Sequence, residues 1–93
     1  MSDGSIQKMY QFYEIFNDFN RIRILICLND EEKSVRQITR YTGLNKTIVL
    51  SQLEYLFNCK IILQNKKEKT DKYKIADKSM LKIINDIIKH INK

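Results

Sequence analysis

Apolar residues recur at helical spacing along most of this 93-residue chain, and the spacing changes to two between about residues 61 and 75. Before that change, start signals at Ser34 and Asn45 divide residues 34–58 into two helices, separated by Thr42-Gly43. A further helix is expected over about residues 78–92. This order predicts a mainly α fold with one short hairpin, in a single domain that spans residues 1–93.

The first of the two central helices begins with a capping box. The Ser34 hydroxyl can accept a hydrogen bond from the Gln37 amide while the Gln37 side chain reaches back to residue 34. Val35, Ile38 and Tyr41 are expected to lie together on one apolar face of this helix. Gly43 stands where a helix end needs the left-handed conformation, so the helix should end after about eight residues.

The second central helix is capped by Asn45 and has one apolar face. Val49, Leu53 and Leu56 recur at spacings of four and three, so they should be buried together. The residues expected in solvent are Lys46, Thr47, Ser51 and Glu54.

Two short strands follow, joined by a lysine-rich turn. Their expected inward positions are Ile61, Leu63, Tyr73 and Ile75. The segment carries Lys66, Lys67, Lys69, Lys72 and Lys74. It lacks the Asn-Gly or Asp-Gly pair of a tight hairpin, so a longer, mobile loop is expected. A helix-turn-helix over about 34–58 and a hairpin over about 61–75 indicate a winged helix-turn-helix, whose second helix enters the major groove of DNA.

Both ends of the chain are predicted to be helices with apolar stripes too broad for a small core to bury. A chain of this length buries only about 60 to 65 per cent of its unfolded surface, so dimerisation would stabilise it. The C-terminal helix is capped by Asp77 or Ser79. The expected dimer interface consists of Ile6, Met9, Tyr10, Tyr13, Leu81, Ile84, Ile87, Ile88 and Ile91.

A formal net charge of +6 and a pI near 9.4 favour an acidic partner. The basic residues gather in the hairpin and helix-turn-helix, whereas Asp30, Glu31 and Glu32 form a loop expected to lie away from the DNA-facing surface. The alternative is that the hairpin lysines only keep the protein soluble. No run approaches the roughly 20 apolar residues of a membrane span, and the N-terminus lacks a secretion signal, so we expect a cytoplasmic protein.

Catalytic and metal-binding motifs are sparse. No nucleophile elbow, phosphate-binding loop or zinc-protease motif is present, and we expect neither catalysis nor a cofactor. Glu14, Asp18 and Glu54 are interpreted as charges on helix surfaces. Asp86 and His90, four residues apart, could hold a metal ion across a dimer, or His90 could simply face solvent.

The two thiols have different expected surroundings. Cys27 lies within an apolar run and is expected to be buried, whereas Cys59 follows the second central helix and could be packed or exposed and redox-active. A disulfide between them requires Cα atoms within about 7 Å and would be unusual in a reducing cytosol.

Three segments resemble the winged-helix regulators of the arsenic-repressor (ArsR) type. Residues 16–25, Phe-Asn-Asp-Phe-Asn-Arg-Ile-Arg-Ile-Leu, resemble the family's D-P-T-R-L-R-I-L run, residues 38–47 are similar to its L-A-x-x-L-G-L-S-Q-S, and residues 53–56 precede the hairpin. The resemblance covers about residues 6–91. It implies a homodimeric transcriptional regulator whose recognition helices enter successive major grooves and whose wings reach the flanking DNA.

The resemblance and the charge pattern together predict the residues that contact double-stranded DNA. They are Asn45, Lys46, Thr47, Ser51, Gln52, Lys66, Lys67, Lys69 and Lys72. The family often has polar residues where this chain has Ile48 and Leu50, which could contact thymine methyl groups or add packing. Metal-sensing members carry Cys-x-Cys where this chain has Ser34-Val35-Arg36, so the usual family metal site is not expected.

The sequence therefore predicts a DNA-binding transcriptional regulator, specifically a repressor that binds an inverted repeat as a homodimer. Two other functions are open. An architectural protein would bind DNA with little sequence preference. A winged-helix protein-interaction module is favoured by Leu50 and Glu54, which put a hydrophobe and an acid near the expected DNA-facing surface.

Overall fold

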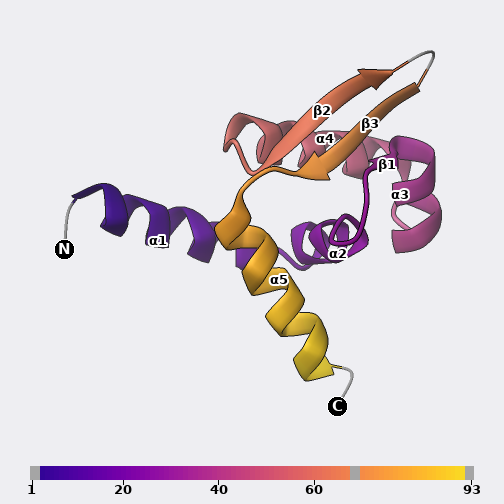
Figure 1. The fold of residues 1–93 in the computed structure, drawn as a ribbon. Helices are drawn as coiled ribbons and strands as arrows, with labels where there is room; N and C mark the ends of the chain where they lie inside the picture. The colour runs from indigo at the N-terminus through magenta and orange to yellow at the C-terminus, as the bar shows by residue number, and fades with distance from the viewer. Residues whose placement is uncertain (1–2, 68–69, 92–93) are drawn as a thin grey trace.

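The computed structural model describes residues 3–67 and 70–91 (Figure 1). The helices are α1 (Asp3–Phe16), α2 (Phe19–Cys27), α3 (Val35–Thr42), α4 (Lys46–Asn58) and α5 (Lys78–Ile91), and the strands are β1 (Lys33–Ser34), β2 (Ile62–Lys67) and β3 (Thr70–Ile75). The strands form one antiparallel sheet in the order β1-β3-β2. The predicted mainly α fold with a hairpin is confirmed, and β1 adds a short third strand.

The capping predictions for the central helices are confirmed. Gln37 N donates to Ser34 Oγ at 3.2 Å, and Ser34 N donates to Gln37 Oε1 at 2.8 Å. Gly43 is left-handed with φ 74°, and Ile48 N donates to Asn45 Oδ1 at 2.8 Å. These local signals set the start of both helices and the sharp turn between them.

Tyr41 is not on the buried face of α3 as predicted, because its side chain is 63% exposed. Thr42 is buried instead, and its hydroxyl donates to the Ile38 carbonyl at 2.7 Å. In the last turn of this short helix, Thr42 and not Tyr41 points toward the core. The guanidinium of Arg23, on α2, donates to the Thr42 carbonyl and joins this helix end to α2.

The core lies where α2, α3, α4 and α5 meet the base of the hairpin. Val49, Leu53 and Leu56 of α4 are buried as predicted. Ile24 and Leu25 of α2 are buried in the same cluster. The remaining members of the cluster are Ile15, Cys27, Leu28, Ile38, Ile61, Ile62, Met80 and Ile84. One face of α4 is therefore packed against the core, and the opposite face is exposed to solvent.

The hairpin differs from its prediction in phase and in length. Ile61 and Ile62 are both buried, whereas Leu63, predicted to point inward, is 49% exposed. The physical reason is that residue 61 still belongs to the turn after α4, where its N–H donates to the Leu56 carbonyl at 3.0 Å, so the alternation begins at Ile62.

The predicted long loop is also wrong, because strand pairing continues to Lys67 and Thr70. The connecting residues, 68 and 69, lie outside the described ranges. The wing is therefore a paired hairpin for most of its length, and we use that name for residues 62–67 and 70–75.

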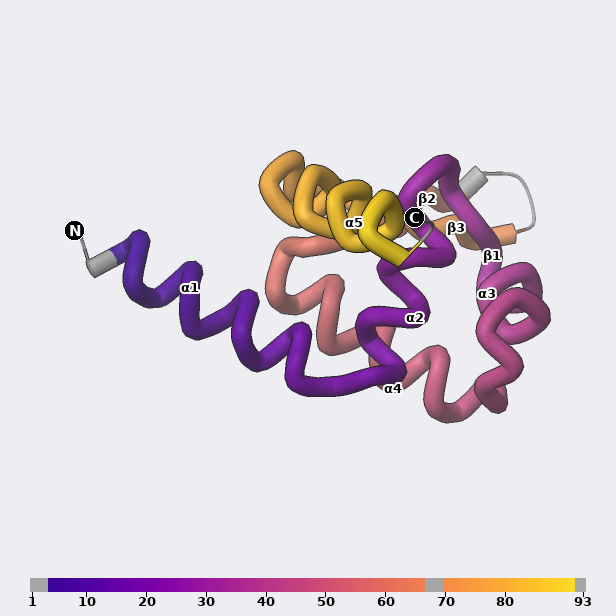
Figure 2. Tube along the Cα trace, turned by 90° about the horizontal axis from the view of Figure 1, so that it is seen from below, coloured from indigo at the N-terminus to yellow at the C-terminus, as the bar shows by residue number. Residues whose placement is uncertain are grey.

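The terminal helices α1 and α5 run in different directions, and α1 extends away from the rest of the fold (Figures 1 and 2). Asp77 is the cap of α5, since Met80 N donates to Asp77 Oδ1 at 2.9 Å, which decides between the two predicted caps. Residue 92, included in the predicted C-terminal helix, lies outside the described residues. Within those residues, no helix is both long and apolar enough to span a membrane.

We predict that Gly43→Ala lowers the free energy of unfolding by about 1 to 2 kcal/mol, because a left-handed residue places its Cβ too close to a carbonyl oxygen. A Cβ at this position would have only Arg23 Nη2 near it, at 3.9 Å, so the cost is conformational. Chemical denaturation measures it. Gly43→Asn should cost less, because Asn tolerates this conformation. Equal losses for the two variants would contradict the account.

Candidate nucleic-acid interface

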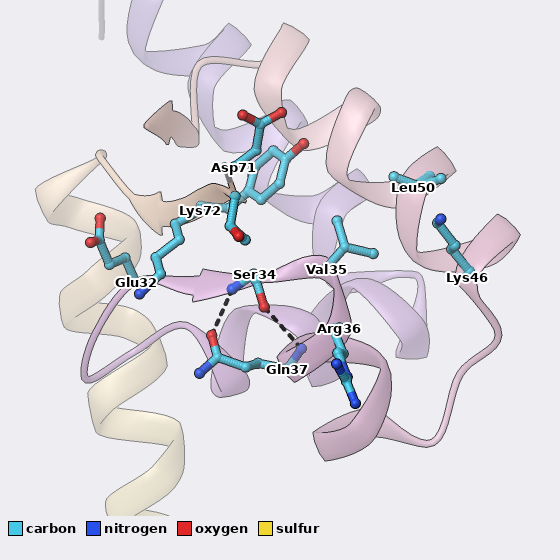
Figure 3. A pocket seen from close by; sticks show the side chains of 11 residues that line it. Glu32, Ser34, Val35, Arg36, Gln37, Lys46, Leu50, Asp71 and Lys72 are labelled. Atoms are coloured by element: carbon cyan, nitrogen blue, oxygen red, sulfur yellow. Dashed lines mark hydrogen bonds between the residues drawn. The ribbon is translucent and has the colours of Figure 1, made fainter. Parts of the chain in front are cut away.

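A groove of about 790 Å³ lies between the start of α3, the start of α4 and strand β3 (Figure 3). Its lining residues are Glu32, Ser34, Val35, Arg36, Gln37, Lys46, Leu50, Thr70, Asp71, Lys72 and Tyr73. The helix-turn-helix and the wing thus share one concave surface. The capping box formed by Ser34 and Gln37 fixes the start of α3 at the edge of this groove.

Three cationic side chains from three different elements line this groove. Arg36 comes from α3, Lys46 from α4 and Lys72 from β3. Arg36 is not among the residues predicted from the sequence to contact DNA. A usable signal was present, since Arg36 is the second residue of a capped helix and lies outside its apolar pattern. Cations that converge on one groove suit the phosphates of a nucleic acid.

The polar face of α4 borders this groove. Lys46, Thr47, Ser51 and the cap residue Asn45 are all exposed, as the sequence predicted for the first three. Of the two apolar positions that depart from the family pattern, Ile48 is half-buried and Leu50 is 42% exposed in the groove. Leu50 is therefore available for an apolar contact with a partner.

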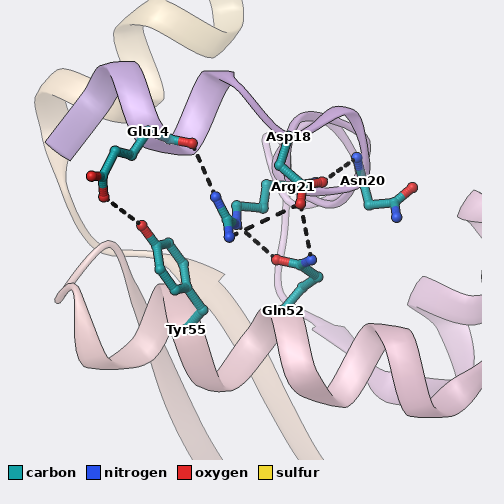
Figure 4. A network of polar contacts seen from close by, with 6 residues as sticks. All are labelled: Glu14, Asp18, Asn20, Arg21, Gln52 and Tyr55. Atoms are coloured by element: carbon teal, nitrogen blue, oxygen red, sulfur yellow. Dashed lines mark hydrogen bonds and ion pairs between the residues drawn. The ribbon is translucent and has the colours of Figure 1, made fainter. Parts of the chain in front are cut away.

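Gln52 does not share this face, which corrects its selection as a DNA-contacting residue (Figure 4). Its Oε1 accepts from Arg21 Nε at 2.8 Å, and its Nε2 donates to Asp18 Oδ2 at 3.3 Å. Its amide is therefore occupied within the protein, on the side of α4 that faces α2. Asp18 is likewise more than a surface charge, since its carboxylate caps α2 through Asn20 N at 2.8 Å.

The acidic loop before β1 was expected to lie away from the DNA-facing surface, and for Glu32 this is wrong. Glu32 lines the groove, and Asn65 Nδ2 on the wing donates to its carboxylate at 3.3 Å. The other two acids of this loop, Asp30 and Glu31, pair with Lys33 instead. Lys33 Nζ lies 2.9 Å from Asp30 Oδ1 and 3.6 Å from Glu31 Oε1. The hydrogen bond from Lys33 holds the pKa of Asp30 below its usual value.

A second carboxylate, Asp71, enters the groove from β3 and accepts from Gln64 Nε2 at 2.9 Å. The groove therefore combines cations with two acids held by wing amides. Such a surface does not attract every phosphate equally.

The wing carries further lysines, of which Lys72 lines this groove. Lys66 and Lys74 are exposed, and Lys72 is half-buried. Lys66 pairs in register with Asp71, and Lys72 with Asn65. The side chain of Lys67 and the whole of Lys69, both predicted to contact DNA, lie outside what the structure describes.

The predicted dimer stripe on α1 is largely exposed in the single chain. Ile6, Met9, Tyr10 and Tyr13 are 44, 61, 70 and 69% exposed. In the single chain, these four side chains leave a large apolar area of α1 in solvent.

The second predicted stripe, on α5, is only partly available. Leu81, Ile87 and Ile88 are half-buried and Ile91 is 66% exposed. Ile84 is corrected, because it is fully buried in the core of its own chain and has no surface to offer.

The two cysteines are free thiols in different surroundings. Cys27 is 2% exposed, as expected, and burial raises the pKa of its thiol. Cys59 is half-buried at the end of α4.

No three His, Cys, Asp or Glu side chains in the described part of the chain lie close enough to bind a metal ion together. Ser34 and Arg36, at the place of the family's thiolates, are a capping hydroxyl and an exposed guanidinium. Neither group suits a soft metal ion.

The order of elements, the cap geometry and the groove between helix-turn-helix and wing define a winged helix-turn-helix protein. Residues 18–62 match the family described as "Bacterial regulatory protein, arsR family". Over that segment, the chain is similar to this family. No curated protein matches the chain.

Solved structures share the whole fold at low sequence identity. The chain is similar to HlyU from Vibrio cholerae (19% identity, 100% of both chains covered, TM-score 0.89). It is also similar to a homodimeric winged helix-turn-helix DNA-binding domain from Mycobacterium bovis (19%, 99% and 88% covered, TM-score 0.79). A third similar structure is the transcriptional repressor BigR from Xylella fastidiosa (16%, 94% and 93% covered, TM-score 0.78).

We predict that a thiol reagent such as Ellman's reagent modifies the native protein in one fast and one slow phase. Cys59 should account for the fast phase, because Cys27 is buried and its raised pKa leaves little thiolate. Absorbance measured during the reaction separates the phases. Cys59→Ser should remove the fast phase and Cys27→Ser the slow one. A fast phase that persists in Cys59→Ser would contradict this assignment.

Proposed function

We propose that this protein is a sequence-specific repressor that binds double-stranded DNA as a homodimer, each protomer reading one half of an inverted repeat. The observation that carries the proposal is the groove, in which Arg36, Lys46 and Lys72 converge beside the exposed polar face of α4. A helix with cations beside it can enter the major groove while those cations contact the DNA backbone.

Base reading is assigned to the first turns of α4. Lys46, Thr47 and Ser51 are exposed there, with side chains that can donate hydrogen bonds to base edges. Leu50 offers an apolar surface for the methyl group of thymine. Asn45 keeps its amide N–H donors for DNA while its Oδ1 caps the helix.

Phosphate contacts are assigned to Arg36 and to the wing lysines 66, 67, 69 and 72. Most of the affinity should come from neutralised phosphates, which makes binding depend on salt. For about 6 to 10 phosphates neutralised by a dimer, raising the salt from about 50 to 200 mM should weaken binding by about 10³- to 10⁵-fold.

Dimerisation is assigned to the exposed stripe of α1 together with the outer residues of α5. Tyr10 and Tyr13 carry large apolar rings, yet they are 70 and 69% exposed in the single chain. The similar structure from Mycobacterium bovis is a homodimer. Two-fold symmetry would place two α4 helices about one DNA turn apart, roughly 10 base pairs centre to centre.

The proposed regulator does not use the Cys-x-Cys metal site of metal-sensing relatives, because its residues there are Ser34, Val35 and Arg36. Without thiolates at these positions, repression could be controlled by the concentration of the protein or by a ligand other than a soft metal ion.

The test is a binding assay with the DNA upstream of the protein's own coding sequence and with a random duplex, at several salt concentrations. The mass in solution is measured in parallel. A repressor predicts a dimer that prefers the upstream DNA by about 10³-fold or more. Equal affinity for both duplexes would instead indicate an architectural protein.

A protein-interaction role is the second candidate, and one observation favours it. An apolar depression of about 280 Å³ between α4 and the wing is lined by Leu50, Leu53, Glu54, Phe57, Gln64 and Tyr73. Phe57 is 45% exposed there. Absence of binding to either duplex would favour this role.

We predict that replacing Lys66, Lys67 and Lys69 together with Gln weakens binding to specific and random DNA alike. Each lost phosphate contact should reduce the slope of log affinity against log salt by about 0.9. Fluorescence anisotropy at several salt concentrations measures this slope. The matched control changes Lys78, Lys82 and Lys89 of α5, which lose the same charge outside the groove. Equal slopes for the two triple variants would remove the wing from the DNA contacts.

We predict that Glu32→Gln strengthens binding to random DNA by about two- to fivefold, because it removes a carboxylate that repels phosphates in the groove. The amide oxygen of Gln can still accept from Asn65. Glu31→Gln is the control, with the same change of charge one residue away and outside the groove lining. If both variants bind random DNA equally well, Glu32 does not act from within the groove.

A further inference from the structure

Arg21, on α2, contacts both the end of α1 and one side of α4 (Figure 4). Its Nη1 donates to the Glu14 carbonyl in the last turn of α1 at 2.9 Å, and its Nε donates to Gln52 Oε1 at 2.8 Å. Its guanidinium lies over the Tyr55 ring, with Cζ 3.8 Å from the ring centroid. A single side chain therefore satisfies a helix-end carbonyl of α1 and holds two residues of α4.

Asp18 completes this contact from the start of α2. One carboxylate oxygen caps α2, and the other accepts from Gln52 Nε2 at 3.3 Å and lies 4.0 Å from Arg21 Nη2. Gln52 is thus held by a donor on one side and an acceptor on the other. Its side chain cannot rotate without loss of both bonds, so the face that α4 turns toward α2 is fixed.

Tyr55 adds a link back to α1. Its hydroxyl donates to Glu14 Oε2 at 3.4 Å, and burial raises the pKa of Tyr55, so the donor proton is retained. Arg21, Gln52 and Tyr55 therefore form one junction between α1 and α4, with Asp18 and Glu14 at its ends.

Ile15 anchors α1 in the core, where it is fully buried. The other polar contacts of α1 are weaker than those of Arg21. Gln11 Nε2 donates to the Cys59 carbonyl at 3.5 Å, at the limit of a hydrogen bond. Lys8 pairs with Asp77 at 3.2 Å, but Lys8 is 49% exposed and ion pairs in water contribute little. Arg21 is only 19% exposed and makes charge-assisted hydrogen bonds, which are shorter and stronger. Because α1 extends from the fold, a small rotation at its end moves its whole stripe (Figure 2).

We propose that Arg21 is a positioning residue that sets the separation of the two DNA half-sites. This inference rests on the proposed function, in which α1 carries dimer contacts and α4 reads bases. If both hold, the angle between α1 and α4 fixes how far apart the two α4 helices of a dimer lie. Arg21 holds that angle through Glu14, Gln52 and Tyr55.

The test selects binding sites from a randomised duplex library with the wild-type protein, Arg21→Lys and Gln52→Leu. Arg21→Lys keeps the net charge, so a general loss of attraction to DNA does not explain its effect. A Lys ammonium is a compact charge and cannot reproduce the fork that reaches Glu14 and Gln52 together. Gln52→Leu removes the same contact from the side of α4.

Wild-type protein should select inverted repeats with one half-site separation, near 10 base pairs. Both variants should select the same half-site sequence with several separations. Their affinity for the wild-type separation should fall by about tenfold, the equivalent of one charge-assisted hydrogen bond.

A merely structural role of Arg21 would lower stability and leave the selected separation unchanged. Ile62→Val controls for this, because it trims a buried side chain away from the junction. Melting temperature and mass are measured for every variant. Ile62→Val should keep one separation.

Two results would overturn the inference, and they distinguish its failure from the failure of the proposed function. If the wild type selects one separation and both variants keep it, Arg21 does not position the helices, and the proposed function stands. If the wild type selects no inverted repeat at all, the proposed function fails and this inference fails with it.

Discussion

Burial of one face of α4 is the interaction on which the rest of the structure depends. Val49, Leu53 and Leu56 are each at most 2% exposed, which fixes the rotation of this helix about its own axis. The opposite face, with Lys46, Thr47 and Ser51, is then necessarily in solvent. A helix with a narrower apolar face could rotate about its own axis, and its polar side chains would then not keep one orientation relative to the rest of the protein.

The elements around α4 give that exposed face its chemical character. The left-handed turn at Gly43 brings α3 beside the start of α4, and β3 pairs with β1 immediately before α3. Cations from α3, α4 and β3 therefore line one groove, yet Glu32 and Asp71 line it too. Mixed charge weakens attraction to phosphates in general and leaves a larger share of discrimination to base contacts. This arrangement suits a regulator better than a DNA-packaging protein.

Local signals in the sequence were sufficient for most of the fold. The Ser34–Gln37 box, Gly43 and the cap at Asn45 each act within a few residues, so the sequence predicts them directly. Leu63 and Tyr41 were misplaced because the phase of a period depends on where an element starts and ends, and that is set by tertiary contacts. Ile61 is held in the turn by the Leu56 carbonyl, which shifts the strand by one residue.

The candidate site was less accessible from sequence. Arg21 and Gln52 are 31 residues apart, and no local rule predicts that they bind each other. Glu32 enters the groove because a two-residue strand, too short to show periodicity, turns the preceding loop toward the wing. Residue types therefore indicated a basic surface near α4, while the exact set of side chains on it depended on long-range packing.

The most direct test of the central claim is an NMR titration of isotope-labelled protein with a duplex carrying its upstream DNA. If α3, α4 and the wing form one DNA-facing surface, amide shifts should change at Arg36, at residues 45–51 and along β2 and β3. The core residues and the outer end of α5 should change little. Shifts concentrated on α1 and α5, with α4 unaffected, would contradict the account.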